Sequence, residues 1–373
     1  MKKKVLQVIH GFTMGGAETL VKEYCLKLNK DKYDVSVLSF FKYNSPYEKI
    51  LEDAGIKITY INDYNEACTR DGRKRMKRIG MILRRYWFIR TYIKKESPDI
   101  LHTHLALNSY ILFAAPKKGT RIVHTVHNEP SVLWNRSKSR RIDYFSVCRL
   151  IKKYQMKFIT LHEPMRQEVD EMFGVKDSVV LNNGIDFARF ENVLSKEDVR
   201  EKENIPKDAF VIGHIGRFDE QKNHKFLIEV FKIIHEKNEK AFLLMIGNGK
   251  LQQEVEAQLE DCGVKYCSKI LSNRTDIPDL LNAMDRFVFP SVFEGLGIVL
   301  IEAQKAGVPC IASAAIPKAA VVSNLMKQLE LTLPAEEWAD EVLCTVSEKI
   351  VYQGIDAWNM NSVVQHLEEI YEI

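Results

Sequence analysis

Short runs of apolar residues alternate with segments of helical periodicity along the chain. The first set of runs predicts seven strands: Val5–Ile9, Val35–Phe41, Ile56–Ile61, Ile100–His104, Ile122–Val126, Phe158–Leu161 and Val179–Asn182. Short apolar strands separated by helices are typical of a parallel α/β sheet that is buried on both faces. The polar, glycine-containing segment Asn182–Asp186 follows and is interpreted as a link between two halves.

The same alternation starts again after residue 190. Its predicted strands are Phe210–Ile215, Phe242–Ile246, Lys265–Tyr266, Phe287–Phe289 and Pro309–Ala312, interleaved with helices such as Lys222–Glu236 and Ile277–Ala283. We therefore expect an α/β protein with two doubly wound Rossmann-like domains, 1–182 and 187–355, facing across a cleft that forms the default site. A closing helix within 356–373 is expected, and packing on either half is open, including a return to the first domain.

Composition narrows the class of protein. A chain of 373 residues with 46% hydrophobic and 28% charged residues is typical of a soluble globular protein and excludes disorder and coiled coil as main themes. No apolar stretch approaches the ~18 residues of a membrane span, and Val5–Ile9 is too short for a signal peptide, so a cytoplasmic location is expected. The seven cysteines lack Cys-x-x-Cys spacing, which predicts reduced thiols rather than disulfides or a zinc site.

The net charge is divided unequally between the halves. Residues 1–185 carry a formal charge of +15 and the remainder −11, and the basic excess is concentrated in 70–95. Apolar residues recur there at helical spacing, which predicts a basic amphipathic helix. Two interpretations stay open: peripheral contact with the anionic inner face of the cell membrane, or a core-packed helix with a solvated basic face. No nucleic-acid partner is expected.

Two glutamates provide the best clue to function. Glu294 and Glu302 flank Gly295-Leu296-Gly297, which follows an apolar strand and precedes a predicted helix at 298–306. A helix N-terminus presents backbone amides that bind phosphate, and the glutamates on either side offer acceptors for sugar hydroxyls. This segment therefore predicts a sugar-nucleotide site.

A second segment offers cations for the same ligand. Gly216-Arg217 follows the strand Phe210–Ile215, which puts Arg217 at its carboxyl end, and Lys222 lies at the predicted start of the next helix. An arginine fork and a lysine point charge can clamp a diphosphate and neutralise the charge of a leaving phosphate, whereas a solvated basic pair is the alternative interpretation. Gly247, in Gly247-Asn248-Gly249, ends the next strand in a similar way.

The first half contributes a glycine loop and several histidines. Gly15 and Gly16 lie between the first strand and a helix, where glycines allow a phosphate to approach the backbone, although a tight turn would also explain them. The sequences His102-Thr103-His104 and His124-Thr125-Val126-His127 suggest a metal site only weakly, because no cysteine or carboxylate completes a set of ligands. No Asp-x-Asp motif is present, so a metal-independent reaction is expected.

Four motifs together resemble a known family. Gly15-Gly16-Ala17-Glu18, Asn183-Gly184-Ile185-Asp186, Gly216-Arg217 with Lys222, and Glu294 with Glu302 are similar to those of the retaining family 4 (group 1) glycosyltransferases of the GT-B fold. The segment Ala312–Lys318 further resembles the bacterial branch that makes exopolysaccharides and capsules. The resemblance implies a hexosyltransferase that moves a sugar from a nucleotide-sugar donor to a glycan or lipid-linked acceptor. It favours a UDP-sugar as the donor and implies no cofactor.

The resemblance also implies roles for individual residues. Gly16 would lie by the donor diphosphate, which Arg217 and Lys222 would hold. Glu294 would contact the transferred sugar near the amides of 295–297, and Glu302 the ribose. His127 would hydrogen-bond the sugar, and the base would lie against the loop Asn273-Arg274-Thr275.

Three positions depart from the family pattern. Ser313-Ala314, Pro317-Lys318-Ala319 and Leu161-His162-Glu163 stand where relatives often have Ser-Asp, Pro-Lys-Glu and Val-Ser-Glu. Loss of two carboxylates at Ala314 and Ala319 suggests an alternative, a non-catalytic sugar-nucleotide-binding partner in a polysaccharide assembly complex. An epimerase or phosphorylase on the same framework is a third hypothesis.

Overall fold

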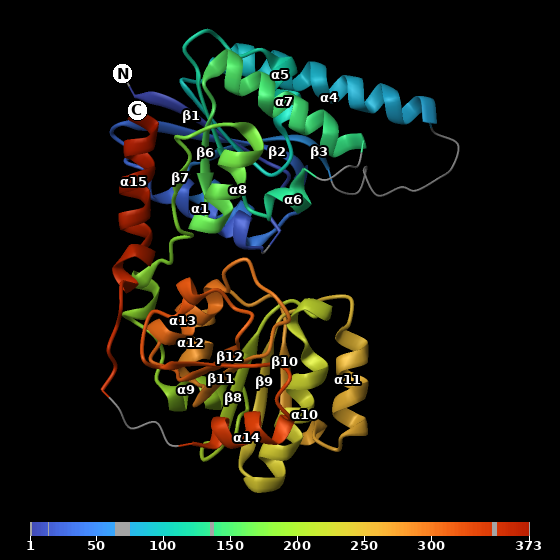
Figure 1. Cartoon of the computed structure of the whole chain (residues 1–373), viewed down its shortest axis with the longest axis vertical. Coiled ribbons are helices and arrows are strands. Elements are labelled where there is room, and N and C mark those ends of the chain that lie inside the picture. The colour runs from blue at the N-terminus through green and yellow to red at the C-terminus, as the bar shows by residue number, and fades with distance from the viewer. Residues whose placement is uncertain (1, 14, 64–74, 135–137, 345–348, 373) are drawn as a thin grey trace. The chain divides into compact units, whose positions relative to one another are not determined.

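A computed structural model describes the chain except for residues 1, 14, 64–74, 135–137, 345–348 and 373, and except for the side chains of 62–63, 75–79 and 138–140. It divides into two compact units, one made of Met1–Gly184 with Met360–Ile373 and the other of Ile185–Asn359 (Figure 1). No helix among the described residues is both long and apolar enough to cross a membrane. Cys68 and the basic residues Arg70, Arg73 and Lys74 lie outside the described residues.

The first unit is built on a seven-stranded parallel sheet in the order β3-β2-β1-β4-β5-β6-β7. The strands are β1 (Lys3–Ile9), β2 (Tyr33–Lys42), β3 (Lys57–Asp63), β4 (Ile100–His104), β5 (Arg121–Thr125), β6 (Lys157–Thr160) and β7 (Val179–Val180). The helices are α1 (Gly16–Lys27), α2 (Pro46–Asp53), α4 (Arg75–Glu96), α5 (Asn108–Ala114), α6 (Pro130–Leu133), α7 (Lys138–Tyr154), α8 (Glu163–Phe173) and α15 (Met360–Glu372).

The order of this sheet reverses between β1 and β4, because chain neighbours β1 and β2 run to one edge and β4 to β7 to the other. Five consecutive residues of β1, Val5–Ile9, are buried, as expected for a central strand covered by helices on both faces. Local signals place the helices. At α2, for example, Ser45 and Glu48 form a reciprocal capping box, and Pro46 occupies the first turn.

The last helix, α15, belongs to the first unit and lies beside α1 (Figure 1). Its apolar face joins a buried cluster with Val5, Ile100 and Val123 from the sheet. At its end, Tyr33 donates a hydrogen bond to Glu372, 2.9 Å away. The first unit therefore contains both ends of the described chain.

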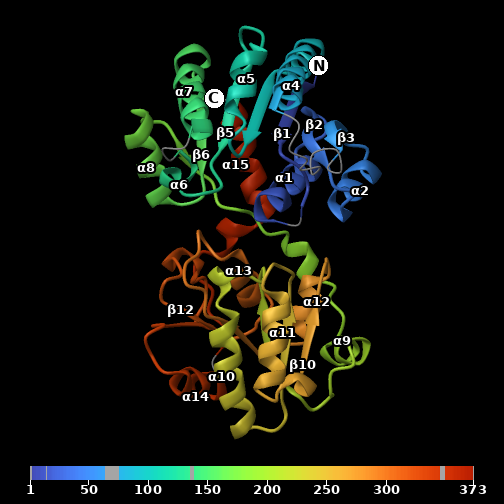
Figure 2. The same ribbon diagram turned by 90° about the vertical axis from the view of Figure 1, so that its right-hand side faces the viewer.

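The second unit has a six-stranded parallel sheet in the order β10-β9-β8-β11-β12-β13. The strands are β8 (Phe210–Ile215), β9 (Ala241–Ile246), β10 (Ser268–Leu271), β11 (Arg286–Phe289), β12 (Cys310–Ser313) and β13 (Met326–Leu329). The helices are α9 (Lys196–Lys202), α10 (His224–Lys237), α11 (Gln252–Asp261), α12 (Ile277–Asn282), α13 (Ile298–Lys305) and α14 (Ala335–Leu343). Helices α10 and α11 lie side by side over the sheet (Figure 2).

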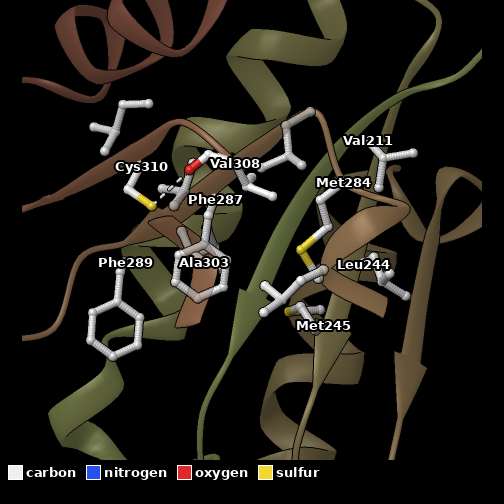
Figure 3. Packing of buried hydrophobic residues seen from close by; sticks show 14 of the residues in the cluster. Val211, Leu244, Met245, Met284, Phe287, Phe289, Ala303, Val308 and Cys310 are labelled. Atoms are coloured by element: carbon white, nitrogen blue, oxygen red, sulfur yellow. Dashed lines mark hydrogen bonds between the residues drawn. The ribbon is translucent and has the colours of Figure 1, made fainter. Parts of the chain in front are cut away.

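The core of the second unit is tightly packed. Figure 3 shows Met284 against β8, where a Cβ atom built on Gly213 would lie 1.9 Å from the Met284 sulfur. Phe287 and Phe289 of β11 are fully buried in the same cluster. A glycine in the middle of β8 therefore makes room for a side chain from the facing layer.

The structure corrects three local predictions. Lys265–Tyr266 is not a strand but part of a 3₁₀ helix, Lys265–Cys267, and the strand follows it as β10. The strand predicted at Val179–Asn182 is reduced to β7, two residues long. The strand β13 was not predicted, because an edge strand reading Met-Lys-Gln-Leu has no apolar run.

Candidate functional site

The order of the second sheet reverses between β8 and β11, and the segments that leave the carboxyl ends of these two strands meet there. Lys222 Nζ lies 2.5 Å from Glu294 Oε1, although the residues are 72 positions apart. Both side chains are largely buried, with 14% and 8% of their surfaces exposed. The Lys222 ammonium also lies 4.6 Å from the centre of the Phe289 ring. Two residues from separate motifs thus form one buried ion pair at the topological switch point, where α/β proteins bind ligands.

Arg217 lies on the same loop but in a different environment. Its side chain is 71% exposed, and its Nε lies 2.7 Å from Asp219 Oδ2. The adjacent Phe218 is fully buried and anchors the loop. The loop therefore presents one solvated cation, Arg217, and one buried cation, Lys222, each held by a carboxylate. Asp219 stood within the sequence motif, but nothing in its spacing marked it as a partner of Arg217.

Lys222 ends a short 3₁₀ helix, Glu220–Lys222, and does not start the next α-helix as predicted. Asn223 adopts a left-handed conformation with φ of 53° and separates this turn from α10. Two bonds tie the turn to the glutamate segment: Val292 N donates to Gln221 O at 2.8 Å, and Gln221 Nε2 donates to Phe293 O at 2.9 Å. These bonds hold the Lys222 loop against the Glu294 segment.

Gly247 and Gly249 pack closely against the backbone of the Arg217 loop. A Cβ atom on Gly247, where φ is +156°, would lie 2.0 Å from the carbonyl oxygen of Gly216, and one on Gly249 would lie 2.3 Å from that of Phe218. Phe218 N donates to Asn248 O at 2.9 Å across this contact. Close packing against the Gly216 backbone therefore requires a glycine at position 247, and this residue supports the Arg217 loop.

The segment after Glu294 turns sharply into α13. Gly295 is exposed, Leu296 is buried, and Gly297 adopts a left-handed conformation with φ of +81° as the N-cap of α13. No side chain caps this helix start. Glu302 lies in the following turn of α13 and is half-buried. The local geometry is that of a helix N-terminus flanked by two carboxylates.

Arg274, predicted to lie in a base-binding loop, is part of an ion-pair network. Its guanidinium contacts Asp276 at 2.5 Å and Glu203 at 2.8 Å, and Glu203 also pairs with Lys269. Its hydrogen bonds to Asp276 lower the pKa of that carboxyl to about 2. Sequence reasoning missed Glu203, because a partner 71 positions away leaves no local signal. The neighbouring Asn273 is exposed and accepts a hydrogen bond from Asn248 at 2.9 Å.

In the first unit, Gly15 and Gly16 begin α1 at the carboxyl end of β1. A Cβ atom on Gly16 would meet no atom of the described residues within 4 Å, whereas one on Gly15 would lie 2.5 Å from a carboxylate oxygen of Glu18. Glu18 in turn accepts a hydrogen bond from Thr13 at 2.8 Å. The backbone at Gly16 is therefore open to approach, as a ligand contact would require, and Gly15 is covered.

His127 lies just beyond the end of β5, half-buried, and its Nε2 is 2.9 Å from His104 Nδ1. Burial lowers the pKa of His127 to about 4, so the ring is neutral near pH 7. The pKa values of His102 and His104 also lie well below 6.5, mainly because both side chains are fully buried. Within the described part of the chain, no group of His, Cys, Asp and Glu has the arrangement of a metal site.

Two further histidines lie next to the buried ion pair and were not predicted. His214 on β8 and His224 at the start of α10 have ring centres 4.8 Å apart, and burial lowers the pKa of His224 to about 4. His214 Nδ1 donates a hydrogen bond to Val288 O, 2.9 Å away. Their sequence positions gave no signal, because burial of a lone histidine is not visible in a pattern of apolar residues.

Two family models match the chain, one for each half. The model described as Glycosyltransferase Family 4 matches residues 14–189, and that described as Glycosyl transferases group 1 matches residues 195–339. Together they cover most of the sequence. The chain therefore belongs to the family 4 (group 1) glycosyltransferases, and it is a transferase enzyme.

Three curated relatives are similar to it. Putative glycosyltransferase EpsF of Bacillus subtilis is 27% identical over 349 residues, 91% of this chain and 87% of that protein. Capsular polysaccharide biosynthesis glycosyltransferase CapH of Staphylococcus aureus is 23% identical over 99% of this chain and 98% of its own. An Escherichia coli enzyme, UDP-Gal:alpha-D-GlcNAc-diphosphoundecaprenol alpha-1,3-galactosyltransferase, is 33% identical over 59% of each. The chain is thus a glycosyltransferase of bacterial polysaccharide biosynthesis.

A solved structure confirms the predicted fold. Anabaena Alr3699/HepE in complex with UDP and glucose aligns over 100% of both chains with a TM-score of 0.72 and 17% identity. At this identity the likeness shows the fold alone, which is the expected GT-B arrangement of two Rossmann-like domains.

Proposed function

We propose that this glycosyltransferase takes its sugar from a UDP-sugar and transfers it, with retention of configuration, to a glycan or lipid-linked acceptor in exopolysaccharide or capsule biosynthesis. The single observation that carries the proposal is the buried Lys222–Glu294 pair at the end of β8 and β11, beside the uncapped start of α13. The names of two relatives support the donor and acceptor classes, because one uses UDP-Gal and a diphosphoundecaprenol-linked sugar and another was solved with UDP and glucose.

Two cationic side chains of the second unit are candidates to bind the donor diphosphate. Lys222 and Arg217 are each neutralised by a carboxylate, so a bound diphosphate would share or replace Glu294 and Asp219 as their acceptors. The buried Lys222 is the stronger candidate for stabilising the departing phosphate, because an ion pair in a poorly hydrated site is screened less than one at the surface. The amides at the start of α13 add further donors.

The family resemblance implies retention, and because no carboxylate among the described residues is placed as a nucleophile, attack on the same face of the sugar is the route that we infer. Glu294 is the carboxylate beside Lys222, and its oxygen is engaged by that ammonium at 2.5 Å, which favours a role in positioning the sugar. The bond between the anomeric carbon and the phosphate oxygen would break as the acceptor oxygen bonds to the same face of that carbon. The acceptor proton would pass to the leaving phosphate, so no covalent enzyme intermediate is needed. Glu302 is assigned to the ribose and His127 to a sugar hydroxyl.

A thermal-shift screen across UDP-, GDP- and ADP-sugars tests the donor. A ligand that binds only the folded state at 100 times its Kd adds about 2.7 kcal/mol of stability. We expect a UDP-sugar to raise the melting temperature of the protein and of Lys225→Ala, an exposed neighbouring cation, but to do so weakly for Arg217→Ala. Unchanged turnover and nucleotide affinity in Arg217→Ala would reject the diphosphate clamp. The anomeric configuration of the product, measured by NMR, tests retention.

The alternative of a non-catalytic binding partner is not favoured, because the whole-length relatives are named as glycosyltransferases. Ala314 is half-buried and Ala319 is exposed, and neither touches the Lys222–Glu294 pair through a hydrogen bond. Restoring acidic residues with Ala314→Asp and Ala319→Glu measures their influence on donor choice.

We also propose that part of the first unit contacts an anionic membrane surface. Ile89 and Ile93 of α4 are buried in the core, but Leu83 and Trp87 are 56% and 61% exposed. Trp87 packs on Phe113 of α5, which is itself 41% exposed. The helix therefore combines both interpretations of the sequence: its later turns are core-packed, and its earlier described turns offer apolar side chains to an interface.

Two arginines lie beside this apolar surface. Arg90 lies over the Phe113 ring at 5.6 Å, and Arg84 is exposed on α4. Basic residues beside exposed aromatic ones are typical of proteins that bind anionic lipid headgroups. We expect the protein to sediment with anionic vesicles at low salt, and Trp87→Ser to reduce this, whereas Val351→Ser, an exposed apolar residue of the other unit, has no effect. Equal sedimentation with neutral vesicles at high salt would reject the proposal.

A further inference from the structure

A continuous path of hydrogen bonds runs through the core of the first unit from α15 to His127. Tyr371 Oη lies 2.7 Å from His102 Nδ1 and 3.0 Å from Gln7 Nε2. Gln7 Oε1 lies 2.9 Å from His104 Nε2, and His104 Nδ1 lies 2.9 Å from His127 Nε2. The first four side chains are fully buried, so no solvent competes for these bonds.

The chemistry of each group fixes the direction of every bond. An amide nitrogen only donates and an amide oxygen only accepts, so Gln7 donates to Tyr371 and accepts from His104 Nε2–H. A neutral His104 with its hydrogen on Nε2 has a bare Nδ1, which must accept from His127 Nε2–H. His127, neutral as well, is then left with a bare Nδ1.

The other end of the path agrees with this order. Because Tyr371 accepts from Gln7, its own hydroxyl hydrogen is free for His102 Nδ1. His102 then carries its hydrogen on Nε2, which donates to Thr125 Oγ1 at 2.7 Å. All the bonds in the path are thus satisfied at once, and reversing one of them would require reversing the others.

The exposed end of the path has a definite polarity. His127 is the half-buried member, and among the described residues its Nδ1 has no hydrogen-bond partner. A bare imidazole nitrogen accepts a hydrogen bond from a hydroxyl and is repelled by a carboxylate or carbonyl oxygen. The path therefore determines that His127 Nδ1 can bind a hydrogen-bond donor such as a hydroxyl group, and not an acceptor.

We propose that Gln7 and Tyr371 are positioning residues that hold His127 in the Nε2–H tautomer, so that its Nδ1 accepts a hydrogen bond from a hydroxyl group of the sugar. The proposal rests on the proposed function, in which His127 contacts the sugar. It adds a substrate class: a sugar that presents a hydroxyl, and not a carboxylate, to His127. It also gives Tyr371 of α15 a role in sugar recognition, although Tyr371 does not contact the sugar.

The test uses the full chain with ¹⁵N-labelled histidine and long-range ¹H–¹⁵N correlation spectra, which distinguish the two neutral tautomers. His127→Gln assigns the His127 signals. In the free protein we expect a hydrogen on Nε2 of His127 and none on Nδ1. The opposite tautomer in the wild-type protein would overturn the proposal without any variant.

Tyr371→Phe tests the long-range part. It keeps the ring that packs on Tyr33 and His102 but removes the hydroxyl that orients Gln7. We expect the second tautomer of His127 to become detectable and kcat/KM to fall about threefold to tenfold, the range of one neutral hydrogen bond. Tyr33→Phe is the matched control, because Tyr33 bonds to Glu372 of the same helix and lies off the path.

The outcomes separate the two proposals. A His127 signal that is unchanged in Tyr371→Phe would overturn the role of Tyr371. The expected tautomer together with full activity in His127→Ala would overturn the role of the path in sugar recognition and with it the assignment of His127. Loss of activity toward every donor, with the expected tautomers and a folded spectrum, would contradict the proposed donor class but leave the path established.

Discussion

The two sheets carry different kinds of polar group at their carboxyl edges. Next to β4 and β5 of the first unit, His104 and His127 form a neutral, hydrogen-bonded path. Next to β8 and β11 of the second, Lys222 and Glu294 form a buried ion pair, with Arg217 and Asp219 beside them. Neutral acceptors suit hydroxyl groups and cations suit phosphate, so the difference supports the proposal that the first edge binds an uncharged part of the substrate and the second an anionic part.

Net charge alone would have suggested the reverse. The first half carries +15, yet the histidines at the ends of β4 and β5 are neutral, and many of its cations lie on outer helices such as α4. The second half carries −11, yet it holds the cations proposed to bind a diphosphate. The charge of a domain therefore reports what its whole surface attracts, and the charge at a strand end reports what its site binds.

The strongest test of this contrast is Lys222→Met. Loss of a cation aimed at a leaving phosphate should lower kcat by about 10²–10³, the effect of removing one preorganised electrostatic donor. It should also destabilise the fold by about 3–5 kcal/mol, because Glu294 would stay buried without its partner. Turnover is measured as UDP release and stability by chemical denaturation.

The double variant Lys222→Met with Glu294→Gln separates the two effects. It leaves no buried unpaired charge, so most of the lost stability should return while turnover stays low. Recovery of turnover along with stability would mean that Lys222 acts only through folding.

A pair of glycine variants gives the next largest effect. Gly247→Ala should destabilise the second unit by about 3 kcal/mol or more, because its Cβ atom would collide with the Gly216 backbone at 2.0 Å. In Gly16→Ala the added Cβ atom would meet none of the described residues within 4 Å, so the variant should leave the melting temperature unchanged while lowering turnover. If Gly16→Ala retained full turnover, the openness of the first loop would have no part in ligand binding.

Acid should weaken the first unit more than the second. Five of its histidines, His10, His102, His104, His124 and His127, have pKa values lowered by burial below the ordinary 6.5, whereas the second unit has two, His214 and His224. Below pH 6.5 the unfolded chain binds protons that these folded sites reject. Stability therefore falls as the pH drops, by up to about 1.4 kcal/mol per histidine per pH unit.

Calorimetry between pH 6.5 and 5, above the range of most carboxyl groups, should show the melting transition of the first unit falling faster. The His124→Asn variant should reduce that slope. Parallel slopes for the two transitions would contradict the burial of these rings in neutral form.

The smallest effect is expected at the exposed pair. Arg217→Ala should change stability by less than about 1 kcal/mol, because a salt bridge with a 71% exposed arginine contributes little. Nucleotide affinity should nevertheless fall. A large loss of stability would show that Arg217 is structural, and the contrast with Lys222 would disappear.

Much of the fold and part of the site could be predicted from the sequence. Apolar runs located central strands such as β1 and β8, because both faces of those strands are buried. They failed at β13, an edge strand with little apolar character, and at Lys265, where a 3₁₀ turn precedes the strand. Burial on both faces leaves a strong pattern in the sequence, and an edge or a turn leaves almost none.

The candidate site also has features that the sequence predicted and features that it did not. Motif order placed Lys222 and Glu294 in one sheet edge, and the structure brings them into contact. Motifs could not reveal that Glu203 engages Arg274 or that Tyr371 reaches His102, because such pairings depend on packing between distant segments. Arg274 remains assigned to the base only as a proposal, and its guanidinium is already engaged.

The placement of α15 has a consequence for how the molecule is made. A ribosome releases the first unit's seven strands long before it releases Met360–Glu372, so the surface formed by Val5, Ile100 and Val123 must wait while the whole second unit is synthesised. During that interval the apolar side chains that α15 covers remain uncovered, and Gln7 and His102 lack their hydrogen bonds to Tyr371. The first unit is begun before the second and completed after it, so a newly made chain depends on residues 360–372 to close its first unit.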